Sequence, residues 1–162
     1  MGSGKTTLAP RLAKKLGLEN YDLDRIIESE TKNSISSFFT TEGEQKFRER
    51  ENKTLKKFIS ENESFVLATG GGTPCFGDCM DLMNSTGITV YLELSPKTLA
   101  QRIIPGKNQR PLLAHLSDEQ LTEYIEKKLN ERSFFYEQSL ITIDGLSVKI
   151  DGLVDIILNH SR

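Results

Sequence analysis

The sequence lacks several features that would place it in a specialised class of protein. It has no apolar run close to the ~18 residues that a membrane-spanning helix needs, so we expect no membrane partner. Its start does not resemble a signal peptide, which predicts a cytoplasmic protein. Its formal net charge is only -2, and this argues against a nucleic-acid partner, because such a partner needs a concentrated basic surface.

Cysteine and histidine are also scarce. Cys75, Cys79, His115 and His160 are the only residues of these two types. They cannot form a zinc site of standard spacing without help from carboxylates. We therefore interpret the two cysteines as small structural side chains.

The remaining pattern predicts one α/β domain over residues 1–162, with no internal repeat or long linker to divide it. Continuous apolar runs at residues 65–69 and 88–92 are typical of strands buried on both faces of a parallel sheet. Weaker strand signals lie at residues 21–23 and 140–143, and helical patterns alternate with all of these runs. In such sheets, ligands bind beyond the carboxyl ends of the strands.

Several helix ends can be read from the sequence. Gly17 is expected to end a helix that starts at the glycine-rich N-terminus. Thr41 and Glu44 have the spacing of a capping box and predict the start of a helix that runs to about residue 59. Ser117 and Gln120 have the same spacing and predict a helix to about residue 135.

The first residues carry most of a phosphate-binding loop. Lys5 would reach the β- and γ-phosphates, and Thr6 would offer its hydroxyl to Mg²⁺. Glycines in such a loop let backbone N–H groups turn toward phosphate oxygens at the positive end of the following helix. The full pattern begins with a glycine two places before Met1 and follows a buried strand, so we expect this strand to be missing from the chain. The loop residues are Gly2, Ser3, Gly4, Lys5, Thr6 and Thr7.

Two carboxylates follow the loop at the end of the strand predicted at residues 21–23. Because side chains alternate along a strand, we expect Asp22 and Asp24 to lie on one face at its carboxyl edge. One could support Mg²⁺ while the other accepts a proton from an attacking hydroxyl. A D-x-D pair is also common in solvated turns, and only its position after the phosphate loop favours the catalytic interpretation.

A run of three glycines, Gly70, Gly71 and Gly72, follows the strand predicted at residues 65–69. Glycines weaken the end of a strand unless a positive φ or close approach to the backbone is needed. The alternative is a plain tight turn. We expect close contact between a substrate and this backbone.

Three arginines could hold anionic groups, because a planar guanidinium binds a carboxylate or phosphate with two parallel hydrogen bonds. Arg48 and Arg132 lie in predicted helices, where either could also be an ordinary surface charge. Arg110 lies in the proline-flanked segment 105–115, which also carries Lys107. This segment fits either a mobile basic flap over a site or a simple surface connection.

Together these segments resemble the shikimate kinase family of small P-loop enzymes. The resemblance implies a three-layer α/β sandwich with a central parallel sheet, a substrate-binding helical region at about residues 24–60 and a lid at about residues 105–116. It also implies a monomeric enzyme that uses ATP and Mg²⁺ to phosphorylate the 3-hydroxyl of shikimate. The matching segments are MGSGKTT, YDLDRIIE, SISSFF, GEQKFRERE, ATGGGTP, VYLELSP, NQRPLL and ERSFFY.

On the acceptor side, the resemblance implies that Asp24 is the base that accepts the hydroxyl proton. Arg48 and Arg132 would hold the shikimate carboxylate, helped by the backbone N–H groups of residues 70–72. Glu51 would orient Arg48 from the same helix face.

On the nucleotide side, the resemblance implies that Asp22 and Thr6 support Mg²⁺. Lys5 and Arg110 would neutralise charge on the transferring phosphoryl group, and Arg102 would pack on the adenine. The stretch at residues 144–147, which contacts adenine in this family, lacks an obvious arginine here.

Two alternatives remain open at this point. A P-loop kinase for another small polyol acid would carry many of the same residues. A non-catalytic nucleotide-binding fragment is also possible, because the family's first strand lies in the middle of a five-stranded sheet. Without that strand we expect the chain to fold poorly, since backbone groups and core side chains would lose their partners.

Overall fold

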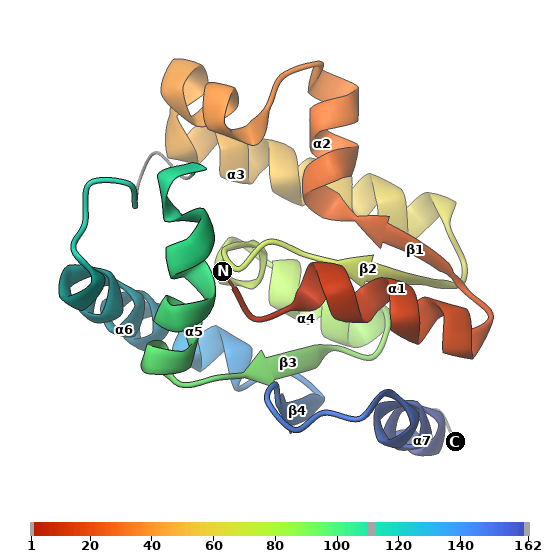
Figure 1. Cartoon of the computed structure of the whole chain (residues 1–162). Helices are drawn as coiled ribbons and strands as arrows, with labels where there is room; N and C mark the ends of the chain where they lie inside the picture. Colours follow the sequence, from red (N-terminus) through yellow and green to blue (C-terminus); the bar gives the residue numbers. More distant parts are fainter. Residues whose placement is uncertain (1, 110–112, 161–162) are drawn as a thin grey trace.

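The computed structural model describes residues 2–109 and 113–160 and has mixed α/β architecture (Figure 1). Most helices and strands alternate along the chain, as the apolar pattern predicts. The order is α1 (Lys5–Leu16), β1 (Glu19–Asp22), α2 (Leu23–Thr31), α3 (Ile35–Glu61), β2 (Phe65–Ala68), η1 (Thr73–Cys75), α4 (Cys79–Thr86), β3 (Val90–Glu93), α5 (Pro96–Ile103), η2 (Ile104–Gln109), α6 (Asp118–Tyr136), β4 (Ile141–Asp144) and α7 (Ile150–His160). Within the described ranges, no helix is long and apolar enough to cross a membrane.

The strands form two parallel pairs instead of one continuous sheet. β1 pairs with β2, with Glu19 opposite Phe65, and β3 pairs with β4, with Val90 opposite Ile141. Among the described residues, no strand joins β2 to β3. A largely apolar cavity of about 800 Å³ is lined there by side chains of α1, β2, α4 and β3. This gap lies where the resemblance places a central strand.

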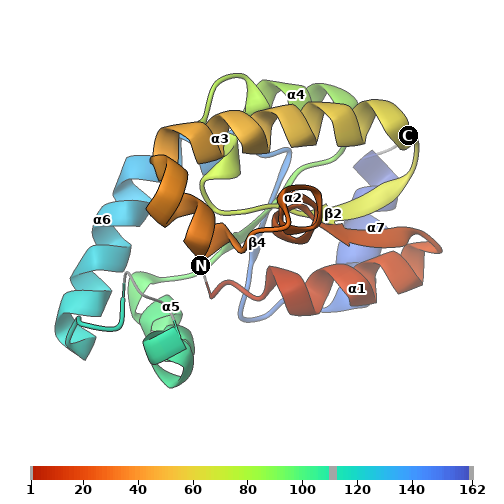
Figure 2. The same cartoon turned by 90° about the horizontal axis from the view of Figure 1, so that it is seen from above.

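Helices cover the strands on two sides (Figure 2). α1 packs on β1 and β2 and also contacts α7. α3 and α4 contact each other and lie on the opposite side of the strands. The predicted three-layer arrangement is therefore confirmed, with the strands as the middle layer.

Two clusters of buried side chains hold the helices in place. One joins α2, α3 and α4 through Leu23, Ile27, Phe47, Leu55 and Cys79. The other joins α5 and α6 through Leu94, Leu99, Ala100, Ile103, Leu113, Leu121 and Ile125. The first cluster thus anchors α3, and the second anchors α6.

Two of the predicted helix ends are confirmed, and one is wrong. Gly17 ends α1 with a φ of 69°, and Ser117 and Gln120 form the predicted capping box of α6. The predicted box at Thr41 does not form, because α3 already begins at Ile35 and the Thr41 hydroxyl donates to the Ser37 carbonyl oxygen. α3 is nevertheless interrupted close to Thr41, because Gly43 has a non-helical φ of 83°.

Candidate active site

The N-terminal residues form a tight loop that opens α1. Gly4 has a φ of 97°, and its carbonyl oxygen accepts hydrogen bonds from the backbone N–H groups of Thr7 and Leu8. Gly2 has a φ of 71°, and a Cβ at this position would lie 3.0 Å from the side chain of Ile103. Both conformations favour glycine, as the phosphate-loop interpretation requires.

A pocket of about 370 Å³ lies at this loop and brings together most of the predicted nucleotide and catalytic residues. Thr7 is the exception in the loop, because it lies on the exposed first turn of α1 and does not line the pocket. The lining residues are Gly2, Ser3, Gly4, Lys5, Thr6, Asp22, Asp24, Ala68, Thr69, Gly70 and Gly71.

Asp22 and Asp24 reach this pocket by a route that strand alternation did not predict. Asp22 is the last residue of β1, and its Oδ1 accepts hydrogen bonds from the backbone N–H groups of Asp24, at 3.0 Å, and Arg25, at 3.4 Å. It is therefore the N-cap of α2. Asp24 lies in the first turn of that helix, so the expectation of two positions on one extended strand was wrong.

The pKa of the Asp24 carboxyl group is raised toward neutral pH. Burial raises its pKa to about 6, the carboxylates of Asp22 and Glu51 push it the same way, and Arg48 opposes them. The pKa of Lys5 is lowered by burial, although Asp24 and Asp22 work against this shift. A carboxyl group with this pKa can act as a proton acceptor near neutral pH.

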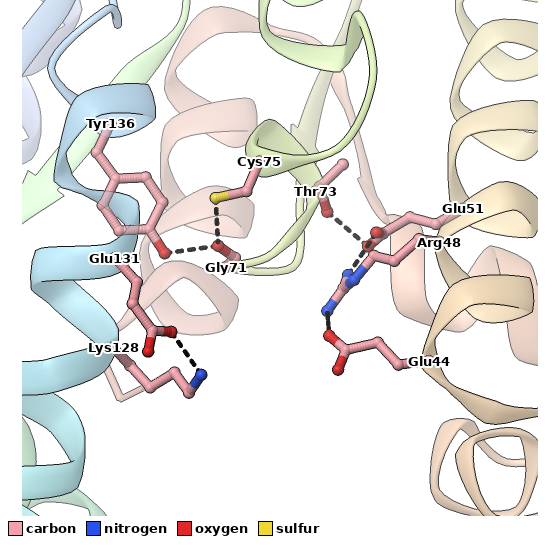
Figure 3. Close-up of polar contacts among 9 residues, drawn as sticks. All are labelled: Glu44, Arg48, Glu51, Gly71, Thr73, Cys75, Lys128, Glu131 and Tyr136. Carbon is pink, nitrogen blue, oxygen red and sulfur yellow. Dashed lines mark hydrogen bonds and ion pairs between the residues drawn. The ribbon is translucent and has the colours of Figure 1, made fainter.

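Arg48 and Glu51 form a buried charged pair on the inner face of α3 (Figure 3). Arg48 Nη1 donates to Glu51 Oε2 at 2.5 Å, and the Thr73 hydroxyl donates to the other oxygen of Glu51 at 2.6 Å. Glu51 is only 1% exposed, whereas Glu44, which lies 3.5 Å from Arg48 Nη2, is largely exposed. The expected Glu51–Arg48 contact is present, and Thr73 is a partner that sequence reasoning missed.

The glycine run after β2 lies between these side chains and the phosphate pocket. A Cβ at Gly70 would lie 3.1 Å from Glu51 Oε1 and 3.5 Å from Asp24 Oδ1. A Cβ at Gly72 would overlap the Arg48 guanidinium. Side chains of the protein itself therefore approach this backbone closely, which explains two of the three glycines without a bound substrate.

Arg132 approaches the same region from α6. The pKa of the Cys75 thiol is raised by burial, while Arg132 and Arg48 both counteract the rise, so both guanidinium groups act on this thiol. Tyr136, one helical turn after Arg132, donates its hydroxyl to the Gly71 carbonyl oxygen at 2.5 Å. Neither Tyr136 nor Cys75 was identified as a site residue from sequence. The spacing of four residues between Arg132 and Tyr136 was the available signal.

The two cysteines have different surroundings. Cys79 is buried in the cluster below α3 and accepts a hydrogen bond from Asn52 Nδ2 at 3.1 Å, which agrees with a structural role. Cys75 is half-buried, and its Sγ lies 3.9 Å from the Gly71 carbonyl oxygen. Within the described ranges, no group of three or more His, Cys, Asp or Glu side chains could hold a metal ion.

The expected nucleotide end of the site is held together by Arg102. Its Nη1 donates to the Ser3 carbonyl oxygen at 3.2 Å and its Nη2 donates to the Gly145 carbonyl oxygen at 3.4 Å. The phosphate loop and the turn after β4 are thereby linked. Arg110 lies outside the described residues, whereas Lys107 of η2 donates to the Leu116 carbonyl oxygen and pairs with Asp118 at 3.0 Å.

Comparisons with known proteins all point to the same family. A family model described as shikimate kinase matches residues 1–159. A shikimate kinase from Azobacteroides pseudotrichonymphae is 43% identical over 155 residues, which cover 96% of this chain and 91% of the relative. One from Parabacteroides distasonis is 43% identical over 145 residues, or 90% of this chain and 83% of the relative.

Solved structures show the same likeness. A shikimate kinase from Bacteroides thetaiotaomicron has 38% sequence identity and a TM-score of 0.89, covering 99% of this chain and 93% of the other. A shikimate kinase from Acinetobacter baumannii, solved in complex with shikimate, has 36% identity and a TM-score of 0.83, covering 99% and 88% of the two chains. The chain therefore belongs to the shikimate kinase family.

Proposed function

We propose that this chain transfers the γ-phosphoryl group of ATP to the 3-hydroxyl of shikimate. The observation that supports this most strongly is the position of Asp24. It lines the phosphate pocket, and its pKa responds to both Glu51 and Arg48 of the neighbouring charged pair. A base that lies between a phosphate pocket and the arginines Arg48 and Arg132 suits phosphoryl transfer to a hydroxyl group on an anionic acceptor.

In the proposed reaction, the 3-hydroxyl oxygen attacks the γ-phosphorus while the bond to the oxygen bridging the β- and γ-phosphates breaks. The hydroxyl proton passes to the Asp24 carboxylate, and ADP leaves with the bridging oxygen. Lys5, near Asp24 and Asp22 in the same site, would balance the charge on the transferring group. Arg110 is proposed to act with Lys5, as part of a lid at about residues 105–116 that keeps water from the phosphoryl group.

The residues at the phosphate loop fit a magnesium ion. Thr6 supplies a hydroxyl and Asp22 a carboxylate, and both line the same pocket. Magnesium prefers a few hard oxygen ligands of this kind, with waters and substrate phosphates completing its shell. When bound there, the ion would neutralise charge on the β- and γ-phosphates.

The acceptor's carboxylate is proposed to lie between Arg48 and Arg132, against the N–H groups of residues 70–72. Support comes from the effect of both arginines on Cys75 and from the position of Arg48 over Gly72. The A. baumannii relative was solved with shikimate, which supports the choice of acceptor over another polyol acid. Arg102, linked to the phosphate loop, is proposed to contact the adenine, and Thr7 to support the loop from α1.

We further propose that the enzyme works as a cytoplasmic monomer without a nucleic-acid or membrane partner. The formal net charge of only -2 supports the absence of a polyanionic partner, which would need a concentrated basic surface. The helical region at about residues 24–60 is proposed to be the acceptor-binding part of one kinase domain.

A coupled assay of ADP release, run with and without shikimate, tests the proposal. We expect release to depend on shikimate and to be lost by at least 100-fold in Asp24→Asn, since general bases contribute roughly 10²–10⁴-fold. Asp151→Asn is the matched control, because this exposed aspartate of α7 pairs with Lys15 of α1 and does not line the pocket. Release that is independent of shikimate, or that survives in Asp24→Asn, would overturn the assignment.

A further inference from the structure

Tyr136 links residues on the two sides of the gap between β2 and β3. Its hydroxyl donates to the Gly71 carbonyl oxygen, on the loop that follows β2. Its ring stacks on Tyr91 of β3, with centroids 5.1 Å apart and planes at 30°. Figure 3 shows the phenol pointing from α6 toward Gly71. One side chain thus contacts both the loop after β2 and strand β3.

Tyr136 also lies beside the arginine proposed to hold the acceptor. Arg132 precedes it by four residues, so both side chains project from the same face of the last turns of α6. Burial raises the pKa of the Tyr136 hydroxyl, and the nearby positive charge of Arg132 and its hydrogen-bonding interaction with the phenol oppose this rise. The phenol therefore donates to the Gly71 carbonyl oxygen and lies close enough to Arg132 to interact with its guanidinium.

We infer that Tyr136 is a positioning residue that fixes Arg132 and the Gly71 loop relative to each other at the acceptor end of the site. This inference rests on the proposed function, because it assumes that the acceptor carboxylate binds between these groups. Tyr136 itself does not need to touch the acceptor. Its hydroxyl sets the separation of two of the groups that do.

The contacts of Arg48 on the α3 side support this role for Tyr136. On the α3 side, Arg48 is fixed by Glu51, which is in turn fixed by Thr73 of η1. Among the described residues, no ion pair joins Arg132 to a buried carboxylate, and the neighbouring Glu131 is exposed and pairs with Lys128 at 2.5 Å. Figure 3 shows this pair on the α6 side, apart from the Arg48–Glu51 pair. The Tyr136 hydroxyl takes the orienting role that Glu51 has for Arg48.

The test compares Tyr136→Phe with Tyr91→Phe. Tyr136→Phe removes the hydroxyl and keeps the stacked ring, whereas Tyr91→Phe removes a hydroxyl from the other ring of the same stack. We expect Tyr136→Phe to raise KM for shikimate roughly 3- to 10-fold, the effect of one lost hydrogen bond. KM for ATP and kcat should each stay within about twofold, and Tyr91→Phe should match the unmodified chain.

A double-mutant cycle with Arg132→Ala then asks whether the effect passes through Arg132. We expect Tyr136→Phe to add less than about twofold to KM for shikimate once Arg132 is absent. Full additivity of the two changes, an unchanged KM in Tyr136→Phe, or an equal rise in KM for ATP would each overturn the inference.

Failure of the proposed function would look different, because the unmodified chain would then release no ADP in response to shikimate. The inference would fail while the unmodified chain remained a normal shikimate-dependent kinase. Calorimetric titration of shikimate into both tyrosine variants gives the same comparison as dissociation constants, independently of turnover.

Discussion

The guanidinium of Arg48 lies against Gly72, in the space that the β-carbon of any other residue would occupy. The absence of a side chain at Gly72 therefore leaves room for the Arg48 guanidinium. The ring of Phe47 also lies near the guanidinium, with its centroid 5.1 Å from the central carbon. Arg48 is held between a backbone, an aromatic ring and the Glu51 carboxylate.

Replacing Gly72 with alanine should displace Arg48 without touching the phosphate pocket. We expect Gly72→Ala to raise KM for shikimate at least 10-fold, while KM for ATP changes less than about threefold, because the loss of a charged contact costs roughly 1.5–3 kcal/mol. Gly152→Ala on α7 is the control, since a Cβ there meets nothing within 4 Å. Equal KM values for shikimate in both variants would contradict the steric account.

The Glu51 carboxylate should matter more than that of Glu44, although both contact Arg48. Glu51→Gln leaves a buried guanidinium with a neutral partner, so we expect a loss of roughly 1–3 kcal/mol in unfolding free energy and a raised KM for shikimate. Glu44→Gln removes an exposed partner at 3.5 Å and should change stability by less than about 1 kcal/mol. Urea unfolding of the two variants measures the difference, and equal losses would show that burial is not the deciding factor.

The raised pKa of Asp24 predicts the acid limb of the rate profile. Since this carboxylate must be ionised to accept a proton, kcat/KM for shikimate should fall about tenfold per pH unit below about pH 6. The ordinary value for an aspartate is 3.8, which would place the limb two units lower. A profile that stays flat down to pH 5 would rule out Asp24 as the base with this pKa.

The same shift has a consequence for stability, with a defined sign. The unfolded chain ionises Asp24 near 3.8 and the folded chain near 6, so the folded form loses stability from this group as pH rises through that window. Asp24→Asn, which mimics the neutral form, should therefore raise Tm by a few degrees at pH 8 and have almost no effect near pH 4. Thermal unfolding followed by circular dichroism at the two pH values measures it. A lowered Tm at pH 8 would contradict the burial of the charge.

The gap between β2 and β3 predicts weak cooperativity. Each of these strands has one edge without a strand partner in the described structure, and apolar side chains line the space between them. We expect a broad calorimetric transition at low temperature and a tendency to aggregate. A sharp transition with equal calorimetric and van't Hoff enthalpies would show that the packing around the gap is sufficient.

The sequence predicted best those features that depend on local chemistry. The phosphate loop, the helix end at Gly17 and the strand positions within about two residues all follow from φ preferences and apolar runs. The pairing of Glu51 with Arg48 could be expected because residues three apart share a helix face. These features need no knowledge of which segments meet in space.

Features that depend on packing were predicted less well. Asp24 was expected on a strand, and it lies on a helix because the Asp22 side chain caps that helix. The start of α3 was placed too late, because Ser34 competes successfully with Thr41 as the cap and Phe38 and Phe39 pack on the core. The contacts of Thr73 with Glu51 and of Tyr136 with Gly71 span 22 and 65 residues, and no local pattern reveals such contacts.

The apolar cavity also determines which reagents suit this protein. Its volume of about 800 Å³ exceeds several-fold the ~150 Å³ that suffices for a benzene-sized guest in a dry protein cavity. Hydrophobic reporter dyes should therefore bind the native protein and give a bright baseline before any heating. Fragment screens that use such dyes would select apolar compounds that occupy this cavity. Ligands of the phosphate pocket are therefore better identified by calorimetry or by ADP release.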